Sequence, residues 1–290
     1  MTAANPLPAD GTDFRERWVP TAPGVALRLL QWTPRRESSP PLLLVPGWIS
    51  GIGSWTAVLE AVIPDRRVVV VETRDKPSAR FERRLRVREM GIPAFAEDLL
   101  AAARASGIAG PDTVAFGSSL GATAILEAMK NDRLPVGGAF LVGPNARFRT
   151  PWWGRPLLLL PPAVYRVARH LAVLYIERFR LDREKEPEQA ARYRNAILGA
   201  EPRRLMLSAR ALADYTVWDR LETVARPVAV AWAPTDRLHE ADAIRRIVET
   251  LPDARPIPCP SNRFMHSREI VPHLDRFVGS LPAGAHRAPA

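Results

Sequence analysis

The stretch Asp112-Thr-Val-Ala-Phe-Gly-Ser-Ser-Leu-Gly121 decides the fold. Its first half is apolar and typical of a buried strand, and good helix formers follow from Ala122 to Lys130. Gly117 and Gly121 flank Ser119 with the G-x-S-x-G spacing of a sharp strand-to-helix turn that exposes a serine hydroxyl. Bulkier residues at both glycine positions would collide in such a turn, so the spacing predicts a reactive serine at 119. A tight turn without chemistry is the alternative.

Apolar runs alternate with helical patterns on both sides of this turn. The predicted strands are Val25–Trp32, Leu42–Val45, Arg67–Glu72, Thr113–Phe116, Ala139–Val142, Val228–Trp232 and Arg255–Pro258. The predicted helices between them are Trp55–Ile63, Phe95–Ala105 and Ala122–Lys130. Such alternation favours an α/β fold with a mostly parallel central sheet covered by helices on both faces.

One segment interrupts the alternation. From about Arg147 to Arg226 the sequence shows no convincing strand, and amphipathic helices are predicted at Ala163–Arg180, Glu188–Leu198 and Arg203–Tyr215. We therefore expect residues 1–146 and 227–290 to form one core domain and residues 147–226 to form a helical insertion.

Composition narrows the class of protein. The 290 residues, 47% hydrophobic and 25% charged, are those of an ordinary globular protein. The single cysteine, Cys259, excludes an internal disulfide and a cysteine zinc site, which suits the cytoplasm. The N-terminus has no secretory pattern, and prolines and glycines break the longest uncharged stretch, so we expect neither export nor a transmembrane segment.

The formal net charge of +10 comes almost entirely from arginines, since the only lysines are Lys76, Lys130 and Lys185. A nucleic-acid or anionic membrane surface is one interpretation, and a solvated arginine-rich surface is the other. The basic residues are spread along the chain, with the densest run at Arg80–Arg88, and no nucleic-acid motif accompanies them. We therefore expect no nucleic-acid partner, while peripheral membrane contact stays open.

A serine hydroxyl needs a base and a group that orients the base before it attacks a carbonyl. Asp236 follows the strand Val228–Trp232, at the strand end where open α/β sheets place their sites. His266 follows the last predicted strand and is the histidine best placed to act as the base. His239 lies only three residues from Asp236, and the remaining histidines lie in the insertion, the final helix or the tail: His170, His273 and His286.

The chain order Ser119, Asp236, His266 and the helical insertion between serine and acid resemble the α/β-hydrolase fold with an inserted cap. The resemblance implies that residues 147–226 form the cap. It also assigns the oxyanion hole to the backbone N–H groups of Trp48, in a glycine-rich loop, and of Leu120, just after the nucleophile. This chain departs from the family at that loop, where Pro46 replaces the usual histidine.

Two other departures affect the expected site. Glu72-Thr-Arg-Asp-Lys-Pro-Ser-Ala replaces the usual aspartate-arginine-glycine turn and contains no glycine. Met265 replaces the glycine that usually precedes the catalytic histidine. Trp153 and Leu157, in an apolar and proline-rich part of the insertion, are predicted to contact substrate together with Met265, although burial against the core is an equal alternative.

The resemblance implies a serine hydrolase that cleaves a carboxylic ester of a lipophilic small molecule through an acyl-enzyme, without metal or cofactor. Acyl transfer and carbon–carbon bond hydrolysis use the same three residues and stay open, as does a non-catalytic ligand-binding protein on this fold. The arginines of the insertion could also favour an anionic group on the substrate. The oligomeric state is left open.

Overall fold

The computed structural model describes residues 6–7, 9–148, 162–179, 184, 186–236 and 239–282. Within these residues nine strands form one sheet. They are β1 (Thr12–Ala22), β2 (Val25–Pro34), β3 (Leu42–Val45), β4 (Val68–Glu72), β5 (Arg80–Phe81), β6 (Gly110–Ser118), β7 (Val136–Val142), β8 (Val228–Trp232) and β9 (Ala254–Pro258).

The sheet order is β1-β2-β4-β3-β6-β7-β8-β9, and β5 pairs with β2 outside this path. Strands β1, β2 and β5 pair antiparallel, as do β2 and β4, whereas every neighbouring pair from β4 to β9 is parallel. The fold is therefore an α/β fold with a mostly parallel sheet, as predicted. All parallel strands end at one edge, so the loops after β3, β6, β7, β8 and β9 meet there.

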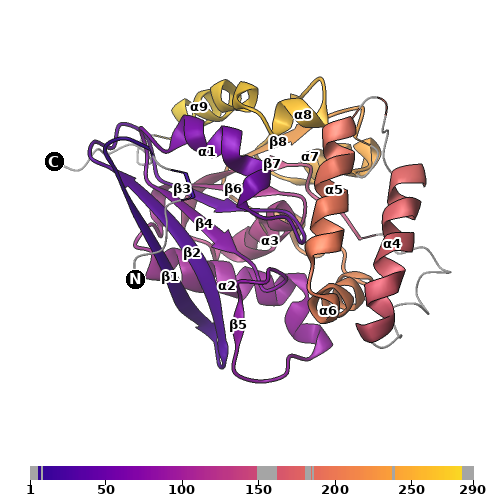
Figure 1. The fold of residues 1–290 in the computed structure, drawn as a ribbon. Helices are drawn as coiled ribbons and strands as arrows, with labels where there is room; N and C mark the ends of the chain where they lie inside the picture. Colours follow the sequence, from indigo (N-terminus) through magenta and orange to yellow (C-terminus); the bar gives the residue numbers. More distant parts are fainter. Residues whose placement is uncertain are drawn as a thin grey trace.

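Helices cover the sheet on both faces (Figure 1). They are α1 (Thr56–Val62), α2 (Ile92–Ala105), α3 (Leu120–Met129), α4 (Pro162–Phe179), α5 (Pro187–Gly199), α6 (Pro202–Leu212), α7 (Ala241–Thr250), α8 (Asn262–Met265) and α9 (Val271–Gly279). Helices α1 and α9 pack on one face, and α2 and α3 pack together on the other. Helices α4, α5 and α6 gather at one side of the molecule, away from both termini.

The core consists of two apolar clusters, one on each face of the sheet. In β3, Leu43 and Val45 belong to the cluster under α2 and α3, whereas Leu42 and Leu44 belong to the cluster under α1 and α9. Successive side chains of a strand point to opposite faces, so a strand buried on both faces is apolar at every position. This explains the uninterrupted Leu and Val runs of β3 and β4.

Every predicted strand and helix lies at its expected place, with ends shifted by a few residues. The sequence analysis missed β1, whose alternation of buried and exposed positions is weak. It also missed β5 and α7. The three helices predicted between Arg147 and Arg226 correspond to α4, α5 and α6. No helix in the described part of the chain is long and apolar enough to span a membrane.

Candidate active site

Ser119 lies at the sharp turn between β6 and α3. Its backbone has φ 51° and ψ −114°, a conformation that costs a residue with a side chain about 1–3 kcal/mol. The turn is held because the Ser119 N–H donates to the Val142 carbonyl at 2.8 Å. A Cβ at Gly117 would lie 2.8 Å from the Ala122 nitrogen, and one at Gly121 would overlap the Val45 carbonyl oxygen. The steric reason for glycine at both positions is therefore present.

A hydrogen-bonded chain connects Ser119 to a histidine and a carboxylate. The Ser119 Oγ lies 3.1 Å from His239 Nε2, and His239 Nδ1 lies 2.9 Å from Asp236 Oδ2. The carboxylate accepts from Nδ1–H, which leaves the Nε2 lone pair to accept the serine hydroxyl proton. Both side chains are buried, so water does not compete for these bonds.

Asp236 is held in its ionised form. Burial acts to raise the pKa of Asp236, but the charge and hydrogen bond of His239 and a 2.8 Å bond from Asn262 Nδ2 outweigh it. These partners keep the pKa of the carboxyl well below its usual range. At neutral pH an anion therefore faces the His239 ring and can stabilise an imidazolium there.

The sequence-based hypothesis assigned the base to His266, whereas in the structure His239 stands between Ser119 and Asp236. His266 Nδ1 lies 2.9 Å from the Asn262 carbonyl oxygen, and its ring packs 4.5 Å from the Trp55 ring. Burial, with a contribution from the charge of Arg192, lowers the pKa of His266 to about 4. Within the described residues His266 makes no hydrogen bond to Ser119 or Asp236, although it lines the same cavity.

Two further side chains reach the serine hydroxyl, and the sequence analysis missed both. Asn145 Nδ2 donates to Ser119 Oγ at 2.9 Å, and the Tyr193 hydroxyl lies close to Ser119 in the same cavity. Asn145 follows β7 at the sheet edge that carries the site, a position that sequence reasoning could have marked. Tyr193 comes from α5 in the insertion, where the sequence pattern shows only an amphipathic helix.

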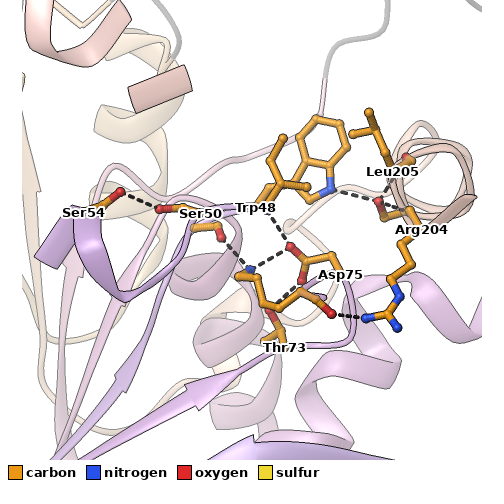
Figure 2. Close-up of polar contacts among 11 residues, drawn as sticks. Trp48, Ser50, Ser54, Thr73, Asp75, Arg204 and Leu205 are labelled. Atoms are coloured by element: carbon orange, nitrogen blue, oxygen red, sulfur yellow. Dashed lines mark hydrogen bonds and ion pairs between the residues drawn. The ribbon is translucent and has the colours of Figure 1, made fainter. Parts of the chain in front are cut away.

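The two predicted oxyanion donors lie at the ends of neighbouring strands. Leu120 is the first residue of α3, where a backbone N–H has no acceptor within its own helix. Trp48 lines the cavity, and a Cβ at Gly47, the preceding residue, would lie 3.4 Å from the Ser119 Cβ. The loop after β3 therefore packs directly against Ser119. The Trp48 indole donates to Ser208 of α6 at 2.9 Å (Figure 2).

A cavity surrounds the Ser119 hydroxyl. It is lined by Gly47, Trp48, Ser50, Ser54, Ser118, Ser119, Val142, Gly143, Arg192, Tyr193, Ala196, Asp236, His239, Asn262 and His266. Met265, predicted to contact substrate, is instead buried in the core, because it lies on the inner side of α8 against the apolar cluster under α9. Trp153 and Leu157 lie outside the described residues.

Arg192 brings a positive charge to this cavity. Its guanidinium donates to Asn262 Oδ1 at 2.5 Å, and it lies 3.9 Å from the carboxylate of the exposed Glu188. Burial lowers the pKa of Arg192, because neighbouring carboxylates offset only part of the lost hydration. The described lining therefore combines apolar surface with polar side chains and carries a cation, Arg192, in the same cavity as Ser119.

This architecture is similar to that of solved structures. No family model and no curated protein sequence matches the chain. Solved structures do match: an esterase from Exiguobacterium antarcticum at TM-score 0.73 and 15% identity, covering 91% of this chain and 99% of that one. The esterase RhEst1 from a Rhodococcus species matches at TM-score 0.70 and 19% identity, covering 92% and 99%. The chain has the α/β-hydrolase fold.

An enol-lactonase from Burkholderia xenovorans is also similar, at TM-score 0.69 and 15% identity, with 90% of this chain and 97% of that chain covered. On this α/β-hydrolase fold Ser119 lies in the turn between β6 and α3, and Asp236 lies in the loop after β8. The histidine bonded to that acid comes three residues after it, rather than after the next strand.

Proposed function

We propose that this protein is a serine hydrolase that cleaves a carboxylic ester, with Ser119 as nucleophile, His239 as base and Asp236 as the residue that orients it. The observation that carries the proposal is the chain of contacts at 3.1 and 2.9 Å behind a serine in a strained turn. A base within hydrogen-bond reach of a serine, itself oriented by a third group, is the arrangement that activates a hydroxyl. The proposal replaces His266 by His239 as the base.

In the first half of the reaction the Ser119 Oγ forms a bond to the ester carbonyl carbon while its proton passes to His239 Nε2. Asp236 stabilises the imidazolium, and the N–H groups of Trp48 and Leu120 receive the developing oxyanion. Removing one such donor typically costs about 3–4 kcal/mol of transition-state stabilisation. The tetrahedral intermediate then expels the alcohol, which takes the proton from His239, and Ser119 carries the acyl group.

In the second half water attacks the acyl carbonyl and gives its proton to His239. The carbon–oxygen bond to Ser119 breaks, the serine recovers a proton, and the carboxylic acid leaves. No step in this sequence needs a metal or cofactor. An acceptor alcohol or amine in place of water would make the same machinery an acyltransferase.

The substrate is proposed to be a small ester whose apolar part contacts the insertion, residues 147–226, as a cap over the site. Helices α5 and α6 support this placement because Tyr193 and Ser208 contact Ser119 and Trp48 respectively. Arg192 adds a preference for an anionic group near the scissile bond. The predicted cytoplasmic location and the absence of a nucleic-acid partner stay predictions.

A fluorophosphonate probe tests the nucleophile directly, since it phosphonylates an activated serine. Wild-type protein and Ser118→Ala are expected to be labelled and to hydrolyse p-nitrophenyl butyrate, whereas Ser119→Ala should do neither. Ser118 is the matched control because it is the adjacent serine and also lines the cavity. Labelling that persists in Ser119→Ala contradicts the assignment. A wild-type protein that binds esters without labelling or turnover would be the non-catalytic ligand-binding alternative.

A further inference from the structure

The loop after β3 rests on a buried ionic network (Figure 2). Lys76 Nζ lies 2.7 Å from Asp75 Oδ2, 3.0 Å from Thr73 Oγ1 and 2.8 Å from the Gly47 carbonyl oxygen. These three acceptors use the three N–H donors of the ammonium group. The exposed fractions of the Lys76 and Asp75 side chains are 3% and 0%, so the network is closed to water.

Asp75 holds the next peptide of the same loop. Its Oδ2 accepts the Ile49 N–H at 2.5 Å, and its Oδ1 accepts the Thr73 hydroxyl at 2.6 Å. Ile49 has φ 50°, a left-handed conformation that is unfavourable for a β-branched residue. Such a conformation persists only when its surroundings impose it, and the Asp75 carboxylate supplies that constraint.

The carbonyl that Lys76 holds belongs to the peptide whose N–H is the proposed donor to the oxyanion. The C=O of Gly47 and the N–H of Trp48 are the two ends of one planar peptide unit, and no peptide bond in the described chain is cis. In a trans peptide the N–H points opposite to the C=O. Fixing the Gly47 carbonyl on Lys76 therefore fixes the direction of the Trp48 N–H on the other side.

A cation on the carbonyl oxygen also polarises the amide, which makes its N–H a stronger hydrogen-bond donor. The loop lies against the nucleophile, since Gly47 packs on Ser119. We propose that Lys76, with Asp75 as its counter-ion, is a positioning residue that orients and polarises the Gly47–Trp48 peptide as an oxyanion donor. This inference rests on the proposed function.

The network also explains two departures from the family pattern. Pro46 removes the side chain that usually braces this loop, and Asp75 and Lys76 occupy the turn where glycine is usual. In this chain Asp75 and Lys76, in the turn after β4, hold the loop after β3 instead. Arg204 of α6 holds that turn in place, since its guanidinium donates to the carbonyls of Lys76 and of Ala79.

The test compares three variants. Lys76→Met removes the ammonium and keeps the length of the side chain. Asp75→Asn/Lys76→Met removes both charges, which avoids leaving a buried carboxylate unpaired. Lys130→Met is the matched control, because Lys130 is also a buried lysine in an ion pair. Its Nζ lies 2.6 Å from Glu127 Oε2, and this pair lies away from the site.

The first readout is the kcat and KM for p-nitrophenyl butyrate, together with affinity for a trifluoromethyl ketone that forms an anionic adduct with the serine. Lys76→Met should lower kcat and ketone affinity by about tenfold or more and leave KM within about twofold, because the donor acts on the oxyanion and not on the ground state. The double variant should stay equally impaired, whereas Lys130→Met should resemble wild type.

The second readout does not depend on activity. Hydrogen exchange of the amides at positions 48 and 49 should be faster in Lys76→Met than in Lys130→Met, because the loop has lost its restraint. Recovery of activity in the double variant would show that Lys76 serves only to neutralise Asp75 and would overturn the inference. Unchanged kcat, ketone affinity and exchange in Lys76→Met would do the same. An inactive, unlabelled wild type would instead refute the proposed function, and the exchange measurement would still decide whether Lys76 restrains the loop.

Discussion

His239→Ala should abolish the ester hydrolysis that His266→Ala leaves largely intact. Both histidines line the cavity of Ser119, so the two variants are matched in location. The 3.1 Å contact to Ser119 Oγ and the 2.9 Å contact to Asp236 belong to His239 alone. Without that ring the hydroxyl keeps Asn145 and Tyr193 as neighbours.

Neither neighbour can replace the base. The Asn145 amide donates to the hydroxyl, and burial raises the pKa of Tyr193, so its phenol stays protonated at neutral pH. The loss in kcat should therefore be at least about a thousandfold, or about 4 kcal/mol of transition-state stabilisation. His266→Ala loses the ring contact with Trp55 and should keep kcat within about tenfold.

The pKa of His266 supports the same ranking. A pKa of about 4 leaves the ring neutral at pH 7 and makes it a weak acceptor for a serine proton. The assay is steady-state hydrolysis of p-nitrophenyl butyrate, with circular dichroism to confirm folding of each variant. Added imidazole should restore part of the activity of His239→Ala. A thousandfold loss in His266→Ala, with more than about a tenth of kcat retained in His239→Ala, would show that His266 and not His239 is the base.

Three other predictions follow from single contacts. A Cβ at Gly143, which has φ 53°, would lie 3.0 Å from His239 Nδ1. Gly143→Ala should therefore displace the ring and lower kcat by about tenfold or more, with KM nearly unchanged. A kcat equal to that of wild type would contradict this prediction. Arg192 lines the cavity, so Arg192→Met should raise KM about tenfold for an ester with a free carboxylate, such as p-nitrophenyl hemisuccinate. KM for the neutral butyrate ester, measured in parallel, should not change. Equal effects on both esters would exclude recognition of the substrate charge. Folding lowers the pKa of His266 from 6.5 to about 4, so between these pH values the unfolded chain binds a proton that the folded chain does not. The free energy of unfolding should therefore decrease by up to about 3 kcal/mol as the pH is lowered from 6.5 to 4. In urea titrations His266→Gln should flatten this slope, and an unchanged slope would assign it to other groups.

The fold was predictable because its signals are local. A strand buried on both faces must be apolar throughout, so β3, β4 and β8 stand out from the sequence without any tertiary information. The elbow at Ser119 stands out for a similar reason, since two close backbone approaches demand glycine on either side. The edge strand β1 was not predicted because it is half-exposed and its register depends on pairing with β2.

The proposed base, His239, was harder to predict because its position depends on a short turn. Sequence order favoured His266 after the last strand, and His239 was set aside for being three residues from Asp236. In the structure that short separation is what brings the His239 ring to the carboxylate. Sequence spacing does not report how a loop folds back on itself, and residues from three other segments, Asn145, Tyr193 and Asn262, complete the surroundings.

The buried network under Trp48 was not predictable in the same way. The sequence showed only that Pro46 and the Asp75–Lys76 turn depart from the family pattern. In the structure the two departures are in contact. Strands β3 and β4 are parallel neighbours and end side by side, so the loops that follow them meet. Only their contact reveals that the lysine can take over a bracing role.

Ser119 should carry the acyl group during turnover, and intact-protein mass spectrometry with rapid acid quenching detects such an acyl-enzyme. Wild-type protein mixed with p-nitrophenyl butyrate should gain one butyryl group, located by peptide mapping to Ser119, and Ser118→Ala should gain the same adduct. Ser119→Ala should gain none. Hydrolysis by wild type with no adduct at any quench time, or an adduct that survives in Ser119→Ala, would exclude Ser119 as the residue that carries the acyl group.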